Sequence, residues 1–227
     1  MSFQDRKDAA EQLAKKLEQW LEKNKTNEEQ QNSSVILAIP RGGVVIGDIL
    51  SSILDIKLDI IVSRKIRAPD NPELAIGAVM PDGRYFLNQD IINMLKVTQR
   101  YIEVEVNIQT REIENRLLLF RGNKYYDNEL NDKTVIIVDD GIATGSTIFA
   151  AAKWTNNNQK CKELVVAVPV APPDTIYKLK KEVSDNVIAL YTPEVFDAVG
   201  QFYQNFEQVT DDKVREIMKR HGYAVKN

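Results

Sequence analysis

The chain contains 227 residues, of which 43% are hydrophobic and 28% are charged, and its formal net charge is −3 at neutral pH. These values are typical of a globular protein and argue against a general surface for nucleic acids or membranes. One histidine and one cysteine are too few for a His/Cys metal cluster or an intrachain disulfide framework. Because no apolar run is long enough to span a bilayer and the N-terminus lacks the apolar region of a signal peptide, we expect a cytoplasmic protein.

Helix and strand patterns alternate along the first part of the chain. Apolar residues at three- and four-residue spacing predict an amphipathic helix over residues 5–23, and a polar linker follows over 23–34. A buried strand, a helix, a second strand, a hairpin and a short helix are expected next, at residues 35–39, 43–54, 58–62, 75–87 and 90–95. The pair Asp82-Gly83 predicts the hairpin, because it favours a tight reversal.

Residues 101–108 alternate like a strand but also fit one face of a helix. We expect a helix, because Thr98 can cap its start and Gly122 can end it. Strands and helices then alternate at residues 135–138, 148–154, 164–168, 174–182 and 187–190, with a last helix at 211–220. The alternation predicts an α/β fold with a mostly parallel central sheet flanked by helices. We expect a single domain over 1–227, with an N-terminal helix at 5–23, a core at about 34–190 and a C-terminal lid or tail at 191–227.

Residues 134–147 read TVIIVDDGIATGST, a buried strand that ends in two acids and a turn rich in glycine and hydroxyl groups. In open α/β sheets, anions bind at the carboxyl ends of strands, where backbone N–H groups of a small-residue turn and a helix N-terminus converge. The hydroxyl groups of the turn are further donors, whereas Asp139 and Asp140 suit sugar hydroxyls, either directly or through a hydrated cation. A phosphate at the turn beside a diol at the acids describes a ribose 5-phosphate.

Two other kinds of nucleotide-binding site are also built after buried strands, and the sequence supports neither. A Walker B strand ends in acids, but it needs a partner loop of the type G-x-x-x-x-G-K-S/T, and the sequence has none. Residues 42–47 have the glycine spacing but are followed by Asp48 instead of lysine. The G-x-G-x-x-G fingerprint of dinucleotide sites is also absent.

Residues 135–147 closely resemble the phosphoribosyl-diphosphate (PRPP) signature of type I phosphoribosyltransferases. The resemblance implies the fold of that family, including a small hood or lid subdomain, and Mg²⁺ that is carried by PRPP without a direct protein ligand. It implies that the paired acids hold the ribose 2- and 3-hydroxyls and that the turn holds the 5-phosphate. The PRPP-binding residues expected on this basis are Asp139, Asp140, Gly141, Ala143, Thr144, Gly145, Ser146 and Thr147. Dimers are common in the family, so we expect a homodimer.

Two further segments resemble the diphosphate contacts of this family. Pro40, Arg41, Gly42 and Gly43 stand where relatives have a pyrophosphate loop, often with a cis peptide, although an ordinary strand-to-helix turn also fits. Arg64 and Lys65, with Arg67 close by, are expected to be cations without nearby acids, and they resemble the pyrophosphate-contacting pair of adenine- and orotate-type relatives. A solvated surface loop is the alternative. The expected catalytic group is Arg41, Arg64 and Lys65.

The acceptor is not assigned by the sequence. Ala143 stands where the hypoxanthine-guanine and xanthine branches carry an acid, which argues against a 6-oxopurine acceptor. Phe196, Phe202 and Tyr203 could stack on an acceptor ring, although aromatic residues at such spacings more often pack a lid onto the core. We therefore expect transfer of the 5-phosphoribosyl group between PRPP and a small nitrogenous base with release of pyrophosphate, with no nucleic-acid or membrane partner. The alternative is a catalytically silent regulatory protein that senses PRPP.

Overall fold

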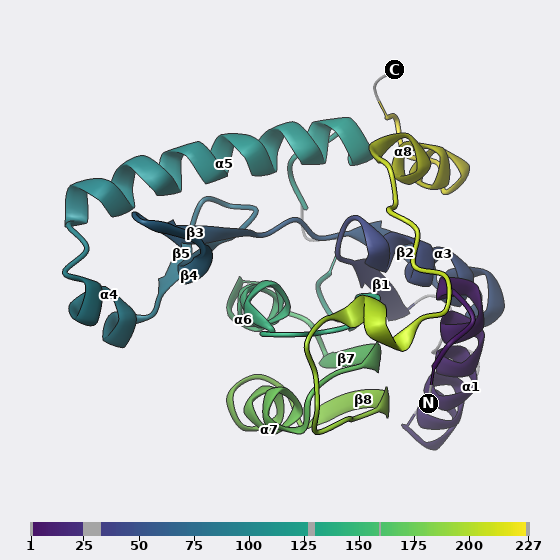
Figure 1. Cartoon of the computed structure of the whole chain (residues 1–227). Coiled ribbons are helices and arrows are strands. Elements are labelled where there is room, and N and C mark those ends of the chain that lie inside the picture. The colour runs from purple at the N-terminus through teal and green to yellow at the C-terminus, as the bar shows by residue number, and fades with distance from the viewer. Residues whose placement is uncertain (1, 25–32, 127–129, 159, 226–227) are drawn as a thin grey trace.

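The computed structural model describes residues 2–24, 33–126, 130–158 and 160–225 (Figure 1). The polar linker expected over 23–34 falls largely outside these residues. Among the described helices, none combines the length and hydrophobicity that crossing a bilayer requires.

A five-stranded parallel sheet forms the centre of the molecule. Its strands, in the spatial order β2-β1-β6-β7-β8, are Lys57–Ile60, Ser34–Ala38, Thr134–Val138, Glu163–Val170 and Asn186–Tyr191. β1 and β6 are buried along their whole length, as the aliphatic runs of the sequence predict. Ala38 lies opposite both Ile60 and Val138, so β2, β1 and β6 end level with one another. The segments that follow these three strands therefore begin at the same edge.

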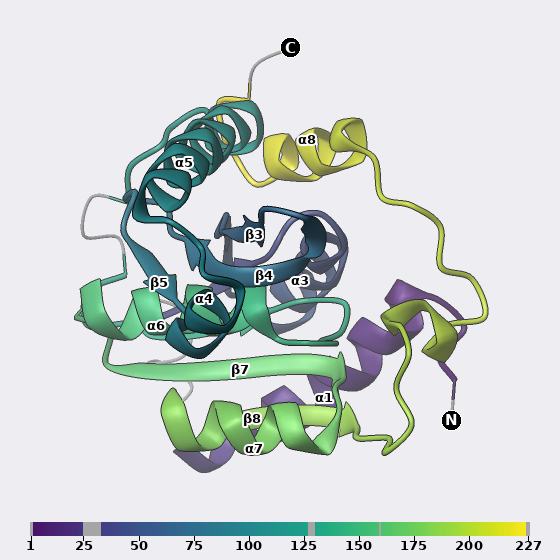
Figure 2. The ribbon, with the colours of Figure 1, turned by 60° about the vertical axis from the view of Figure 1, so that its left-hand side comes forward.

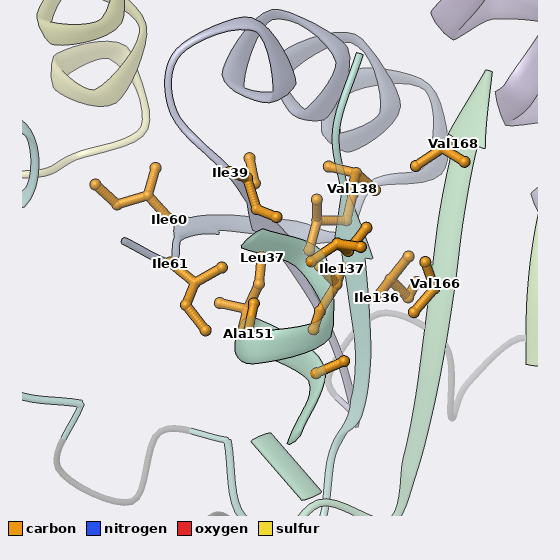
Figure 3. Close-up of a cluster of buried hydrophobic side chains, with 14 of the residues drawn as sticks. Leu37, Ile39, Ile60, Ile61, Ile136, Ile137, Val138, Ala151, Val166 and Val168 are labelled. Atoms are coloured by element: carbon orange, nitrogen blue, oxygen red, sulfur yellow. The ribbon is translucent and has the colours of Figure 1, made fainter. Parts of the chain in front are cut away.

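Helices cover both faces of this sheet (Figure 1). α1 (Arg6–Asn24) and α3 (Gly42–Leu54) pack against each other on one face, and α6 (Ser146–Asn158) and α7 (Pro173–Glu182) lie on the other. Leu37, Ile137 and Ala151 of α6 lie together in the core and are fully buried (Figure 3). The structure thus confirms the predicted α/β fold with a parallel central sheet flanked by helices.

A second sheet, which we call the hood, lies between β2 and β6 in the chain. It contains three antiparallel strands, β3 (Arg64–Ala68), β4 (Asn71–Val79) and β5 (Tyr85–Leu87), followed by α4 (Gln89–Leu95) and α5 (Gln99–Arg121). The predicted hairpin and the helical interpretation of residues 101–108 are confirmed. Thr98 Oγ1 accepts a hydrogen bond from the Tyr101 N–H at the start of α5, and Gly122 ends the helix at φ 72°.

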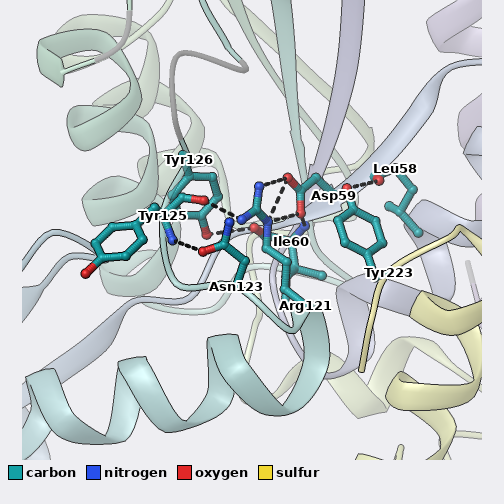
Figure 4. Close-up of polar contacts among 8 residues, drawn as sticks. All are labelled: Leu58, Asp59, Ile60, Arg121, Asn123, Tyr125, Tyr126 and Tyr223. Carbon is teal, nitrogen blue, oxygen red and sulfur yellow. Dashed lines mark hydrogen bonds and ion pairs between the residues drawn. The ribbon is translucent and has the colours of Figure 1, made fainter. Parts of the chain in front are cut away.

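A buried ion pair attaches the hood helix α5 to the central sheet (Figure 4). Arg121, at the end of α5, donates from Nε and Nη2 to the Asp59 carboxylate on β2 at 2.8–3.0 Å, and both side chains are almost fully buried. Tyr126 and Tyr223 donate their hydroxyls to backbone carbonyls of β2 at 2.8 Å. The C-terminal end of α5 is therefore fixed to β2, the strand that leads into the hood.

The tail returns from β8 across the carboxyl edge of the sheet. It forms the short 3₁₀ helix η1 (Val199–Phe202), passes beside the start of the chain, and ends in α8 (Asp211–Arg220), which packs on α3 and α5 (Figure 2). Residues 3 and 4 exchange backbone hydrogen bonds with residues 202–205. The first turn of α1 is therefore held against the tail at the edge where β1 and β6 end.

Candidate active site

The turn after β6 is shaped by close contacts. Gly145 has φ 76°, and a Cβ atom there would lie 2.9 Å from Thr175 Cγ2. Thr175 also donates its hydroxyl to the Ala143 carbonyl at 3.1 Å, which ties α7 to the turn. Because α6 begins at Ser146, its N-terminal N–H groups and partial positive charge face this turn.

A cavity of about 200 Å³ opens over the turn, and we call it the turn cavity. Its lining comprises Asp139, residues 141–148, Lys65 from the hood and Val199 from the tail. Most of the residues expected from the sequence to bind PRPP thus surround one space. Asp140 is next to Asp139 in the chain but is not part of this lining.

The loop after β1 packs directly onto the two acids. A Cβ atom on Gly43 would lie 2.8 Å from the Val138 carbonyl oxygen, and one on Gly42 would overlap the Asp140 carboxylate. The peptide bond between Pro40 and Arg41 is cis. Arg41 forms an ion pair with Asp211 of α8, with 3.5 Å between Nη1 and Oδ1. Only glycine fits where this loop meets the acids.

Arg64 and Lys65, the cations that follow β2, lie at the start of β3 and not in a free surface loop. With Arg67, Pro40 and Thr147 among their neighbours, they line a second cavity of about 460 Å³, which we call the cation cavity. Arg64 Nε donates to Gln109 Oε1 of α5 at 3.1 Å. Lys65 and Thr147 line both cavities, so the two spaces adjoin.

The expectation that these cations lack nearby acids is wrong for Arg64. Burial lowers the pKa of its guanidinium, and Arg116 and Arg67 lower it further, whereas Glu112 and Glu105 raise it. These two acids are on α5, more than 40 positions away in the sequence. The long hood helix therefore brings counter-charges that local sequence does not reveal.

Burial and neighbouring charges shift the pKa values of the two acids. Burial raises the pKa of Asp139 well above its usual range, and the adjacent Asp140 raises it further. Burial also raises the pKa of Asp140, but Arg6 opposes this shift. The Asp139 carboxylate also accepts a hydrogen bond from the Asp140 N–H at 2.9 Å. Keeping both acids ionised in this position costs free energy.

Arg6 is a site residue that sequence reasoning missed. It lies in the first turn of α1 and donates from Nε to Asp140 Oδ2 at 2.8 Å. Tyr203 approaches from the tail and donates its hydroxyl to the Asp140 carbonyl oxygen. The only available signal was a charged residue at the start of an amphipathic helix, and that pattern normally indicates a solvated face.

Two of the three tail aromatics expected to stack on an acceptor are buried. Phe202 and Tyr203 are 7% and 6% exposed, and their rings pack against Tyr191 and Phe3. The half-buried Phe196 lies against Phe202, with 4.9 Å between ring centroids. The interpretation of Phe202 and Tyr203 as acceptor-stacking residues is therefore wrong, because their rings are part of the core.

Comparison with known proteins identifies the family. The sequence model of the phosphoribosyl transferase domain matches residues 5–195. The chain belongs to the phosphoribosyl transferase family. A relative from Mycobacterium tuberculosis H37Rv, named "Putative phosphoribosyl transferase Rv0571c", is 36% identical over 219 residues, which cover 96% of this chain and 46% of the relative. The chain thus spans about half the length of the curated relatives it matches.

One solved structure resembles this chain over nearly its whole length. The protein TT1426 from Thermus thermophilus is 34% identical, with a TM-score of 0.77, and the match covers 97% of this chain and 99% of that one. The family expected from the sequence is therefore confirmed. Among the described residues of this chain, no group of three or more His, Cys, Asp or Glu side chains could hold a metal ion.

Proposed function

We propose that this chain transfers the 5-phosphoribosyl group between PRPP and a small nitrogenous base, with release of pyrophosphate. The proposal is supported above all by one observation: the turn cavity and the cation cavity adjoin, because Lys65 and Thr147 line both. One space has the donors and the acid suited to a sugar phosphate, and its neighbour has the cations suited to a diphosphate. PRPP contains both groups at opposite ends of one ribose.

In the proposed complex, the turn binds the 5-phosphate through backbone N–H groups and through the hydroxyls of Thr144, Ser146 and Thr147. Asp139 and Asp140 accept hydrogen bonds from the ribose hydroxyls. Carboxylates are suited to this task, because an ionised acid accepts from a diol and repels a phosphate that would otherwise bind there.

The proposed reaction requires stabilisation of charge at two places. Positive charge grows on the sugar as the bond from carbon 1 to the leaving oxygen lengthens, and negative charge grows on the departing pyrophosphate. Arg64 and Lys65 are placed to stabilise the leaving group from the hood, and Gly42 and Gly43 allow backbone N–H groups to approach it. Arg41 can join them once it leaves Asp211.

Magnesium fits this site as a cation that arrives with the diphosphate, whose oxygens and bound waters would complete its coordination shell. Its chemistry would be neutralisation of the leaving group. The acceptor enters beside the exposed Ala143, whose side chain has no carboxylate that could contact a purine ring. We therefore propose an acceptor other than a 6-oxopurine.

The test is to incubate the purified protein with PRPP and Mg²⁺ and a panel of nitrogenous bases, and to measure pyrophosphate release. Release that depends on one base is the expected result. Tight PRPP binding without turnover for any acceptor would instead identify the alternative, a PRPP-sensing protein. The matched control is Asp139→Asn with Asp140→Asn, which should abolish PRPP binding while the protein remains folded by circular dichroism. Unchanged PRPP affinity in this variant would contradict the proposed role of the acids.

A further inference from the structure

Arg6 makes a set of contacts that the proposed reaction does not use. Its Nε and Nη2 atoms each lie 2.8 Å from Asp140 Oδ2, and its Nη1 atom donates to the Glu207 carbonyl at 2.7 Å. Its guanidinium stacks on the Phe206 ring, 3.9 Å from the centroid. The Arg6 and Asp140 side chains are only 11% and 14% exposed. Arg6 is therefore held by Asp140 on one side and by the tail on the other.

The surroundings fix the guanidinium in this position. The N–H of Phe3 donates to the Phe202 carbonyl at 2.7 Å, and the N–H of Gln204 donates to the Phe3 carbonyl at 2.8 Å. Phe206, which lies against Arg6, in turn packs on Tyr203, with 4.9 Å between ring centroids. Figure 2 shows the start of the chain beside this part of the tail. An arginine held from two directions keeps one geometry and loses little entropy when its partner binds a ligand.

Asp140 needs such a partner. It follows another acid in a largely buried position, and burial raises the pKa of its carboxyl whereas Arg6 lowers it. Its carboxylate also fills the space beside Gly42, so it lies between the turn after β6 and the loop after β1. Without Arg6, the carboxylate would be a poorly compensated buried charge and would rotate away or take up a proton.

We propose that Arg6 is a positioning residue, which holds the Asp140 carboxylate between the turn after β6 and the loop after β1, within reach of a ribose that binds against Asp139. The inference rests on the proposed function, because it assumes that a ribose phosphate binds at this edge. Neither Arg6 nor Asp140 lines either cavity. Asp140 is next to Asp139, which lines the turn cavity, and Arg6 acts only through Asp140. It should matter for ligands with a ribose diol and not for a phosphate bound at the turn alone.

The experiment compares three ligands by titration calorimetry: PRPP, ribose 5-phosphate and inorganic phosphate. In Arg6→Gln, the affinities for PRPP and ribose 5-phosphate should fall by about tenfold, which is the size expected for one lost charge-assisted contact. The affinity for inorganic phosphate should stay within about twofold. The matched control is Lys7→Gln, which removes the same charge from the same turn of α1. The Lys7 side chain is 73% exposed and pairs only weakly with Glu11 at 3.9 Å, so this variant should leave all three affinities unchanged.

Arg6→Lys provides a second variant that keeps the charge if Arg6→Gln does not fold. Lysine cannot contact Asp140 and the Glu207 carbonyl in the same fork geometry, so the diol-dependent loss should be smaller, about threefold. An equal loss for inorganic phosphate and ribose 5-phosphate would overturn the inference, because it would indicate a merely structural role. Full affinity for ribose 5-phosphate in a folded Arg6→Gln protein would also overturn it. Wild-type protein that binds no ribose phosphate would remove the proposed function together with the inference.

Discussion

Gly42 lies against the Asp140 carboxylate so closely that a Cβ atom at position 42 would be 1.8 Å from Oδ2 and 2.4 Å from Cγ. The loop after β1 and the acids after β6 therefore form one packed unit. A methyl group at this position must displace either the loop or the carboxylate.

We expect Gly42→Ala to weaken PRPP binding by at least about tenfold, because both displaced groups belong to the proposed site. Overpacking of this kind costs about 1–3 kcal/mol of folding free energy. The measurement is calorimetric titration with PRPP, together with urea denaturation. Ser52→Ala, at an exposed position of the same helix, is the control and should bind PRPP normally. Normal PRPP affinity in Gly42→Ala would show that the loop and the acids need not pack together.

Asp139→Asn should stabilise the fold at neutral pH while it weakens PRPP binding. The raised pKa of Asp139 means that its ionised form is disfavoured in the folded protein. Below about pH 3.9 the carboxyl is protonated in both the folded and the unfolded state, so it costs nothing there. As the pH rises from that value through the folded-state pKa, the wild type loses stability, whereas the asparagine variant does not.

Thermal unfolding of Asp139→Asn and wild type between about pH 3.5 and about pH 8 tests this prediction. Each kcal/mol gained should raise the unfolding midpoint by about 2–4 °C, and the gain should disappear at the acidic end of the range. A wild type that is more stable than the variant at neutral pH would contradict the prediction.

Lys65→Gln should weaken the binding of both PRPP and free pyrophosphate, because Lys65 lines both cavities. A lost contact with a charged group is worth about 1.5–3 kcal/mol, or roughly 10- to 150-fold in affinity. The loss should shrink as salt is added, since screening weakens the interaction in the wild type. Lys180→Gln, at an exposed position on α7, controls for the change in net charge. If pyrophosphate binds Lys65→Gln as tightly as wild type, the diphosphate is bound elsewhere.

Arg121→Met should destabilise the protein by about 3–5 kcal/mol, because it removes the cation that pairs with the buried Asp59 carboxylate. Replacing both residues, by Asp59→Leu with Arg121→Met, should recover most of the loss. Urea denaturation of the three proteins measures the effect. A loss below about 1 kcal/mol in the single variant would mean that the pair is dispensable.

The sheet and its loops could be predicted from the sequence, because their signals are local. Aliphatic runs mark β1 and β6, Asp82-Gly83 marks the hairpin, and Thr98 and Gly122 mark the ends of α5. Parallel strands with short connections then bring their following loops to one edge without any knowledge of tertiary contacts.

The long-range contacts around the site could not be predicted, because they join residues that are distant in the chain. Arg6 and Asp140 are 134 positions apart, and their pairing depends on how α1 and the tail dock. The acids near Arg64 come from α5, and the burial of Phe202 depends on the path of the tail. No periodicity in the sequence encodes these orientations.

The hydrogen bonds between residues 3–4 and 202–205 leave the site supported by the first described residues and by the connecting segment between η1 and α8. Exposed termini and connecting segments are where proteases cut and where local unfolding begins. Limited proteolysis between residues 204 and 208 should therefore abolish PRPP binding, while the β-sheet signal in circular dichroism persists. Retained secondary structure in an aged or clipped preparation is thus no evidence of a competent pocket.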